Sequence, residues 1–428
     1  MKHINILFVF LLISCTANAQ IVKKAVKGTF LLKNATLHTI TNGTIQGDLL
    51  IQDGLIADIG SVSDRSATTI ECKGKHVYPG FIDGGTNLGL SEVGSISLTR
   101  DYRELGDFTP HMQALTAVNP NSVSIPVTRT NGVTTVISKT AGGLFPGTAA
   151  LINLYGYTPH KMYAGFKGVQ LNFPSSGKRG RWDRRSEEDI KKDEDKAFKK
   201  VNEIWIKAVE YSRIDSAANA QGKKRLDYNP QMDALLNVVR GKQAIMIEVN
   251  KEKDILNAIK WVEERNVKAI FTGVAEGYRV LNKLAKSGIP VITGPILSIP
   301  RRQSARYDVA YKNAGLMQQA GIKVAIRTNE IENVRNLPFN AGFAATYGMG
   351  IEEALRAITI VPAEIFGIAD QLGSLEKGKI ANLFISDGDP FETKTQVEHL
   401  FINGFSVPIE SRHTLLYDEF LDRDSGEK

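Results

Sequence analysis

One stretch decides the fold of this chain: Val77-Tyr78-Pro79-Gly80-Phe81-Ile82-Asp83-Gly84-Gly85-Thr86-Asn87-Leu88. The Pro79-Gly80 pair is typical of a turn, and the apolar residues after it indicate a short buried strand that ends in a loop. In a (β/α)8 barrel, the loops that follow the parallel strands converge over one end of the packed interior. If this strand opens such a barrel, functional side chains are expected directly after Ile82.

The rest of the chain supports a barrel. After Gly132, short apolar runs alternate with helical patterns, which predicts parallel strands joined by crossover helices. With the first strand these runs make eight; the other seven cover 132–137, 149–152, 168–171, 244–249, 267–272, 290–293 and 322–326. The fold class predicted is therefore α/β.

Both ends of the chain predict a second, smaller β domain. Residues 30–60 contain short strand patterns and Asp53-Gly54, a type I′ hairpin signal. Residues 373–385 and 399–404 supply further strands near the other end. Because strands need partners, the two ends are expected to form one composite domain.

Two segments resemble the amidohydrolase superfamily, most closely its imidazolonepropionase-like branch. They are Pro79-Gly80-Phe81-Ile82-Asp83 and Gly373-Ser374-Leu375-Glu376-Lys377-Gly378-Lys379-Ile380-Ala381. The resemblance runs from about Thr29 to about Val407 and implies a TIM barrel with a small composite β-sandwich. The predicted bounds are a composite domain over 28–78 and 371–410 and a barrel over 79–370, after a signal peptide over 1–19 that the N-terminal residues themselves predict.

The resemblance also implies chemistry. Such proteins hydrolyse non-peptide carbon-nitrogen bonds with one or two divalent metals such as zinc, which activate water and polarise the carbonyl. Their ligands are a His-x-His pair, a lysine or glutamate, two further histidines and an aspartate. Five of the matching positions here carry other residues, namely Gly85, Asn87, Glu248, Thr272 and Asn329. We therefore expect a largely lost ligand set and no metal cofactor.

Histidine counting leads to the same expectation without an alignment. Six histidines follow the predicted signal peptide, and only His111 and His160 lie within the barrel segment. A binuclear site of this type needs four. Both histidines follow a proline and are expected to be loop residues.

A possible pocket is expected at the strand ends, formed by Asp83, Lys167, Glu248, Arg327, Asn329 and Glu330. Asp83 is expected to bond to backbone, and Glu276 to begin a helix. An unpaired buried carboxylate is costly, so Glu248 should have Lys167, Arg279, Arg327 or a ligand as its partner. Glu92 is a further acidic candidate for an oxygen-rich cation site.

Three functions remain open at this point, and the third is a purely structural lipoprotein tethered to the membrane through Cys15. In the first, the barrel mouth binds a small-molecule ligand, or the chain partners a metal-competent paralogue or a second copy of itself. In the second, a hydrolase uses a rearranged site around Glu248, Asn329 and Glu330. No catalytic residue can be assigned from the sequence.

The N-terminus predicts export. Lys2 and His3 precede an apolar run from Ile4 to Ile13, and Ala17-Asn18-Ala19 follows at signal-peptidase spacing. The run is too short for a membrane span, which needs about 20 residues. A periplasmic or secreted location follows, with a lipoprotein anchored at Cys15 as the alternative. Cleavage after Ala19 leaves Cys72 as the only thiol, so no internal disulfide is expected.

The net charge of +7 and the pI near 9.1 could favour nucleic acid, but basic and acidic residues are interspersed. The most charged segment, 178–225, has Ala197, Val201, Ile204, Ala208 and Tyr211 at helical spacing. A long helix packed on the barrel is expected there, with no nucleic-acid binding.

Overall fold

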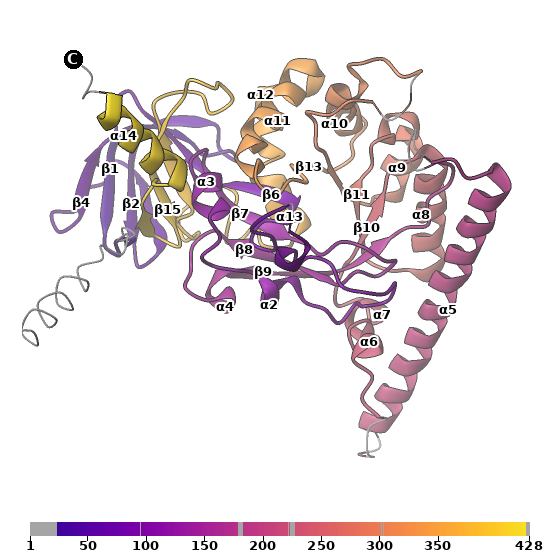
Figure 1. Cartoon of the computed structure of the whole chain (residues 1–428). Helices are drawn as coiled ribbons and strands as arrows, with labels where there is room; N and C mark the ends of the chain where they lie inside the picture. Colours follow the sequence, from indigo (N-terminus) through magenta and orange to yellow (C-terminus); the bar gives the residue numbers. More distant parts are fainter. Residues whose placement is uncertain are drawn as a thin grey trace, which may run out of the picture.

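Two eight-stranded sheets organise the computed structural model of the protein (Figure 1). The structure describes residues 24–94, 96–178, 183–220, 222, 227–300, 302 and 304–424. The predicted signal peptide and Cys15 lie outside these residues. Across the described ranges, every helix is too short or too polar to cross a bilayer.

The barrel sheet contains all eight predicted strands, in the order β13-β12-β11-β10-β9-β8-β7-β6. Their bounds are β6 Phe81–Thr86, β7 Val133–Ser138, β8 Thr148–Asn153, β9 Tyr163–Asn172, β10 Ile245–Val249, β11 Ala269–Gly273, β12 Val291–Thr293 and β13 Val324–Ile326. No strand ladder joins β13 to β6 in the described sheet, so the barrel is nearly closed. Just beyond β13, the Asn329 N–H donates to the Gly85 carbonyl at 3.0 Å and bridges the gap.

The prediction that all eight strands are parallel was wrong for β8. This strand is antiparallel to both of its neighbours, β7 and β9. The connection from β7 to β8 spans only residues 139–147. A parallel crossover needs about a dozen residues or more, so this loop can only turn the chain back. Gly142, Gly143 and Gly147 adopt the positive φ angles that the tight return requires.

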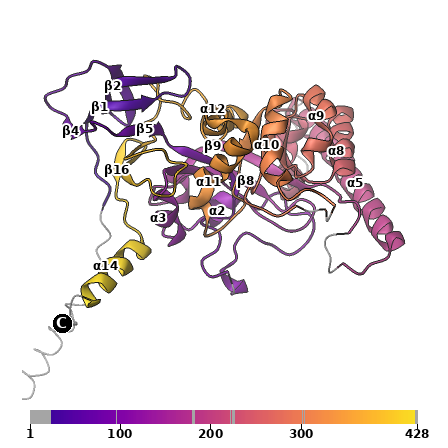
Figure 2. The ribbon, with the colours of Figure 1, turned by 90° about the horizontal axis from the view of Figure 1, so that it is seen from above.

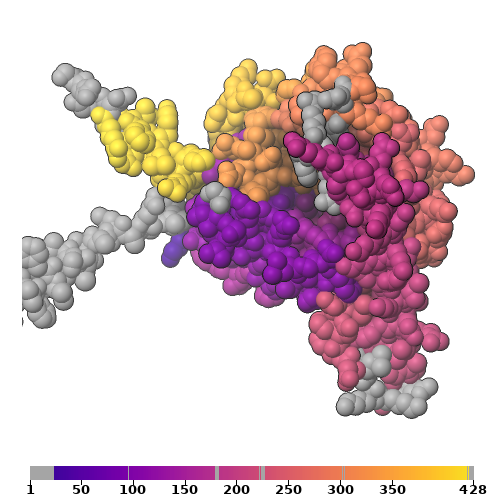
Figure 3. Space-filling view, turned by 45° about the vertical axis from the view of Figure 1, so that its right-hand side comes forward, coloured from indigo at the N-terminus to yellow at the C-terminus, as the bar shows by residue number. Residues whose placement is uncertain are grey.

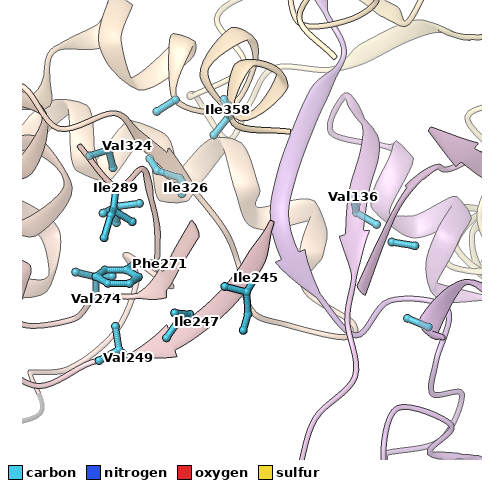
Figure 4. Packing of buried hydrophobic residues seen from close by; sticks show 14 of the residues in the cluster. Val136, Ile245, Ile247, Val249, Phe271, Val274, Ile289, Val324, Ile326 and Ile358 are labelled. Atoms are coloured by element: carbon cyan, nitrogen blue, oxygen red, sulfur yellow. The ribbon is translucent and has the colours of Figure 1, made fainter. Parts of the chain in front are cut away.

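Strand alternation separates two apolar layers. One face of the strands fills the barrel interior with Ile82, Ile137, Leu151, Met246, Ile270, Ile292 and Ala325. Their sequence neighbours point outward into a larger core under the helices, where Ile245, Ile247, Phe271 and Ile326 pack (Figure 4). Because side chains alternate along a strand, a residue two positions after the interior layer faces the barrel axis near the strand end.

Helices cover the barrel. The longest, α5 (Glu187–Ala220), lies on the side of the molecule away from the other sheet (Figures 1 and 2). It buries Val201, Ile204 and Ala208, as the spacing predicted. The other helices of four residues or more are α2 Ala114–Ala117, α3 Ser124–Arg129, α4 Pro159–Met162, α6 Pro230–Asp233, α7 Leu236–Val239, α8 Glu252–Arg265, α9 Leu281–Ser287, α10 Val309–Gln319, α11 Leu337–Ala344, the π-helical turn η4 Ala345–Met349, α12 Ile351–Arg356, α13 Ile360–Ile365 and α14 Arg412–Asp424. Three short 3-10 turns are η1 Ser97–Thr99, η2 Gly277–Arg279 and η3 Val334–Asn336.

The other sheet takes strands from both ends of the chain. Five come from the N-terminal part, β1 Phe30–His38, β2 Thr44–Gln52, β3 Leu55–Gly60, β4 Thr68–Glu71 and β5 His76–Pro79, and three from the C-terminal part, β14 Leu383–Ser386, β15 Val397–Ile402 and β16 Phe405–Val407. Asp53 and Gly54 have φ angles of 52° and 85°, which confirms the predicted hairpin turn between β2 and β3. The domain boundaries of 28–78 and 371–410 stay a prediction. Helix α14 projects from this end of the body (Figure 3).

Candidate functional site

Four polar side chains occupy the barrel mouth, the end at which β6, β7 and β9–β13 finish. Lys139, Glu248, Thr272 and Arg327 each lie two positions after an interior residue, namely Ile137, Met246, Ile270 and Ala325. Strand alternation therefore turns all four toward the barrel axis, above the apolar interior layer. We call these four residues the mouth cluster.

The mouth cluster is built on one ion pair. Arg327 Nη1 donates to Glu248 Oε2 at 2.7 Å and Nη2 donates to Oε1 at 2.8 Å. The Arg327 side chain is 3% exposed and that of Glu248 30% exposed. The Thr272 hydroxyl donates to Glu248 Oε2 at 2.8 Å, and the Asn250 amide to Oε1 at 3.1 Å. The prediction that Glu248 needs a partner is confirmed, and the partner is Arg327.

These contacts fix the charge of Glu248. Burial alone would raise the pKa of its carboxyl, but the Arg327 guanidinium and the nearby Lys139 ammonium outweigh burial and hold the pKa well below its usual range. Glu248 is therefore ionised at neutral pH. Both of its oxygens are occupied by donors of this chain, so the carboxylate is a poor candidate for a general base.

Lys139 lies beside this ion pair. A Cβ atom added to Gly85 would be 3.6 Å from Lys139 Cδ and 3.3 Å from Arg327 Cδ. Glycine at position 85 thus leaves room for two cationic side chains to pass over the backbone. Burial and then the Arg327 charge lower the pKa of the Lys139 ammonium to about 8, against the opposing effect of Glu248 and Asp83.

Asp83 closes the seam of the barrel between β6 and β13. Its side chain is fully buried and accepts the Thr328 hydroxyl at 2.5 Å, the Thr328 N–H at 3.1 Å and the Gly85 N–H at 2.8 Å. Burial raises the pKa of this carboxyl to about 6 even though these donors favour the ionised form. The prediction that Asp83 bonds to backbone is confirmed, because two of these donors are main-chain N–H groups.

Lys167 does not enter the mouth, so its place in the predicted pocket was wrong. Its ammonium donates to Gln113 Oε1 at 2.8 Å. The reason is again alternation: Phe166, the residue before it, packs against the barrel interior layer, so Lys167 points the other way. Arg279, another proposed partner of Glu248, pairs instead with Glu252 at 2.5 Å.

Asn329 and Glu330 follow β13 and are exposed. Their contacts with β6 are made through the backbone: the Asn329 N–H donates to Gly85, and the Glu330 carbonyl accepts the Thr86 hydroxyl. Asn329 has a φ angle of 55°, a left-handed conformation that asparagine tolerates. Neither side chain is among the partners of Glu248, so the structure does not unite the three residues of the rearranged hydrolase site.

A cavity of about 220 Å³ adjoins the mouth cluster. Its wall includes Asn250, which contacts Glu248, and Glu276, which is 4% exposed. Arg302 donates to both Glu276 oxygens at 2.5 and 2.7 Å, and the Glu252 N–H at the start of α8 donates at 2.9 Å. As expected, Glu276 stands at the start of a helical turn, η2, and its carboxylate also accepts from the first turn of α8. Glu92, in turn, accepts only from Asn119 in the described contacts.

Comparison with known proteins finds a family match over part of the chain. Residues 230–407 match the amidohydrolase family. A crystal structure of an amidohydrolase from Thermotoga maritima MSB8 superposes with a TM-score of 0.80 and 25% identity, over 89% of this chain and 99% of that chain. The match to the amidohydrolase family spans β10–β13 of the barrel sheet and β14–β16 of the other sheet. The whole barrel shares the amidohydrolase fold.

An amidohydrolase of Hapsidospora irregularis is 20% identical over 394 residues, which is 84% of this chain and 39% of that protein. Two other relatives match more strongly but only locally. A D-hydantoinase of Geobacillus stearothermophilus is 44% identical over 79 residues, which is 18% of this chain and 16% of that protein. An imidazolonepropionase of Shouchella clausii is 38% identical over 85 residues, 19% of each chain. The chain thus spans less than a fifth of either relative, and the imidazolonepropionase-like branch is only hinted at.

The mouth cluster does not fit the divalent metal that amidohydrolases employ. Of the five expected ligand positions, Gly85 has no side chain, the Asn87 amide donates to the Lys139 carbonyl at 2.6 Å, and Glu248 is bonded to Arg327. In the part of the chain that the structure describes, no group of three or more His, Cys, Asp or Glu residues could hold a metal ion. Two cationic side chains at the same place would also repel a divalent cation.

The two barrel histidines do not supply metal ligands to the mouth cluster. His160 lies in α4, which follows β8 at the end of the barrel opposite the mouth. His111 lies in the long connection between β6 and β7, and its Nδ1 atom has no hydrogen-bond partner among the described residues. His111 is a loop residue, as expected, whereas His160 lies in a short helix because Pro159 occupies its first turn, where proline is tolerated.

Sequence reasoning missed Lys139. A signal for Lys139 was present in the sequence. Ile137 belongs to a predicted strand, and the residue two positions later on an extended chain points to the same side. Counting by two from the apolar strand residues would have selected Lys139 and rejected Lys167.

Proposed function

We propose that this chain is an exported amidohydrolase-superfamily protein that has lost the metal-hydroxide route of its relatives and binds a small molecule in the barrel mouth. One observation carries the proposal: Lys139 and Arg327 pass over Gly85, where the family resemblance expects the first histidine ligand. A cationic cluster at this point replaces an arrangement that would attract a metal.

The chemistry of the mouth supports a small ligand. Arg327 and Glu248 compensate each other, which leaves Lys139 as one excess positive charge above an apolar interior layer. The adjoining cavity of about 220 Å³ is large enough for a few non-hydrogen atoms but below the usual range of about 300–1,000 Å³ for drug-sized ligands. We therefore propose a compact ligand.

Further features of the proposal concern the whole chain. They are the imidazolonepropionase-like branch, the composite β-sandwich, and a periplasmic or secreted location with a lipoprotein anchored at Cys15 as the alternative. A metal-competent paralogue or a second copy of the chain is the proposed partner. Failure of a paralogue to co-purify, together with a monomeric mass in solution, would exclude both partners.

The experiment has two arms. Purified protein is incubated with zinc, passed through a desalting column and analysed for metal; we expect far less than one equivalent per chain. Thermal denaturation is then followed with a panel of small carboxylates, aldehydes and ketones, of which at least one should raise the melting temperature. Near-stoichiometric zinc, or a panel without any stabilising compound, would contradict the proposal.

The alternative is an active hydrolase of carbon-nitrogen bonds that uses Glu248, Asn329 and Glu330. The amidohydrolase fold favours it. The hydrogen bonds of Glu248 to Arg327, Thr272 and Asn250 oppose it, because they occupy the carboxylate that would act on a substrate. Hydrolysis of a lactam or dipeptide substrate that both Glu248→Gln and Asn329→Ala abolish would establish this alternative.

A further inference from the structure

Lys139 is partly exposed and, unlike Lys379 and Lys167, has no side-chain partner among the described residues. Lys379, which is 8% exposed, donates to Ser374 Oγ at 2.5 Å and to Glu376 at 3.2 Å. Lys167 donates to Gln113. The Lys139 ammonium, by contrast, has no hydrogen bond or ion pair with any residue that the structure describes.

The charged form of Lys139 is disfavoured, because partial burial of the side chain removes part of the hydration of its ammonium. The Arg327 charge also repels the Lys139 ammonium and disfavours its protonated form. Both terminal nitrogens of Arg327 remain bonded to Glu248. The amine therefore gains stability either by losing its proton or by acquiring a ligand. With its pKa lowered to about 8, roughly one lysine in ten is neutral at pH 7, and a neutral amine is a nucleophile.

We propose that Lys139 is a covalent attachment site, which binds a small aldehyde or ketone as an imine in the barrel mouth. The proposal rests on the small-ligand function proposed above, because both need a mouth open to solutes. The partial exposure of Lys139 and the 30% exposure of the Glu248 side chain beside it support such access.

The reaction balances without an oxidant or a metal. The lone pair of the neutral Nζ atom attacks the carbonyl carbon and forms the C–N bond. The carbonyl oxygen takes up a proton, and Nζ releases one, which gives a carbinolamine. The C–O bond then breaks, the oxygen leaves as water with a further proton, and the nitrogen lone pair forms the C=N bond as Nζ gives up its second proton. If the imine is protonated, it carries the same single positive charge as the ammonium that it replaces.

The test is reductive trapping on the full-length mature protein. Propanal and glyoxylate serve as a neutral and an anionic probe, each with cyanoborohydride, and peptide mapping by mass spectrometry locates the adducts. We expect Lys139 to react at least ten-fold faster than Lys167 in the same sample, with a rate that rises through an apparent midpoint near pH 8. Lys139→Arg should abolish the fast adduct, and Lys167→Arg should leave it unchanged.

The comparison within the wild-type protein keeps the proposal testable if Lys139→Arg does not fold. A Lys139 rate no greater than that of Lys167, with adducts spread over exposed lysines, would overturn it. Reversible ligand binding without a Lys139 adduct would reject the imine and leave the small-ligand function standing. About one zinc ion per chain after desalting would reject the proposed small-ligand function, whether or not a Lys139 adduct forms.

Discussion

Glu248→Gln tests the mouth cluster most sharply among single substitutions. The change keeps the size of the side chain but removes the only negative charge that Arg327 contacts in the described structure. Two cations, Arg327 and Lys139, would then face each other in a largely buried place. Removing one partner of a buried ion pair costs about 3–5 kcal/mol. Because Glu248 is 30% exposed, we take the lower end, about 3 kcal/mol.

The assay is thermal unfolding by circular dichroism at pH 7. With an unfolding entropy of about 2 cal/mol/K per residue and about 400 folded residues, 3 kcal/mol lowers the melting temperature by about 3–4 °C. Asp107→Asn is the matched control, because Asp107 pairs with Lys200 at 2.9 Å with side chains 58% and 42% exposed. Its effect should stay below about 0.5 kcal/mol.

A second substitution tests the physical cause. Lys139→Met in the Glu248→Gln background removes one of the two repelling cations and should restore part of the lost stability. If Glu248→Gln lowers the melting temperature no more than Asp107→Asn, the ion pair is not the buried unit described here.

The remaining predictions concern the seam, the glycine and two titrations. Thr328→Val removes the hydroxyl that donates to buried Asp83 and should lower the free energy of unfolding in urea by about 2 kcal/mol. An unchanged free energy of unfolding would show that this hydrogen bond does not stabilise the contact between β6 and β13. Gly85→His should displace Lys139 and Arg327 and lower the melting temperature more than Gly85→Ala does, because the alanine Cβ would meet Arg327 Cδ at 3.3 Å and needs only a small shift of that side chain. Because burial raises the pKa of Asp83 from 3.8 to about 6, its contribution to stability is complete below pH 4 and lost as pH rises to 6; Asp83→Asn should remove that decline from the stability profile. Burial and His76 lower the pKa of His38 from 6.5 to about 4, so its contribution is present above pH 6.5 and lost as pH falls to 4; an NMR midpoint for His38 near 6.5 would contradict this.

The sequence predicted the strands because apolar runs and Gly-Pro punctuation are local signals. It also predicted a partner for Glu248, since a buried carboxylate requires one, and Arg327 was among the candidates. The direction of β8 was missed because it depends on the length of the loop before it, which is too short for a crossover helix.

The site was harder to predict than the fold. Lys167 was chosen for its nearness in sequence to a strand end, whereas Lys139 qualifies by alternation after Ile137. Asn329 occupies an expected ligand position, but its left-handed backbone and exposure follow from how the chain leaves β13. No local pattern in the sequence specifies that turn. The role of Gly85 could not be predicted, because it depends on the Lys139 and Arg327 side chains that lie next to its Cα in the folded chain.

The central claim is that a cationic cluster stands where amidohydrolases hold their metal. A crystal structure of the protein grown with excess zinc, with anomalous data collected above and below the zinc edge, tests this claim most directly. The account predicts no anomalous peak in the barrel mouth and an intact Arg327–Glu248 pair. A zinc peak in the mouth, with Glu248 turned from Arg327 to the ion, would contradict it.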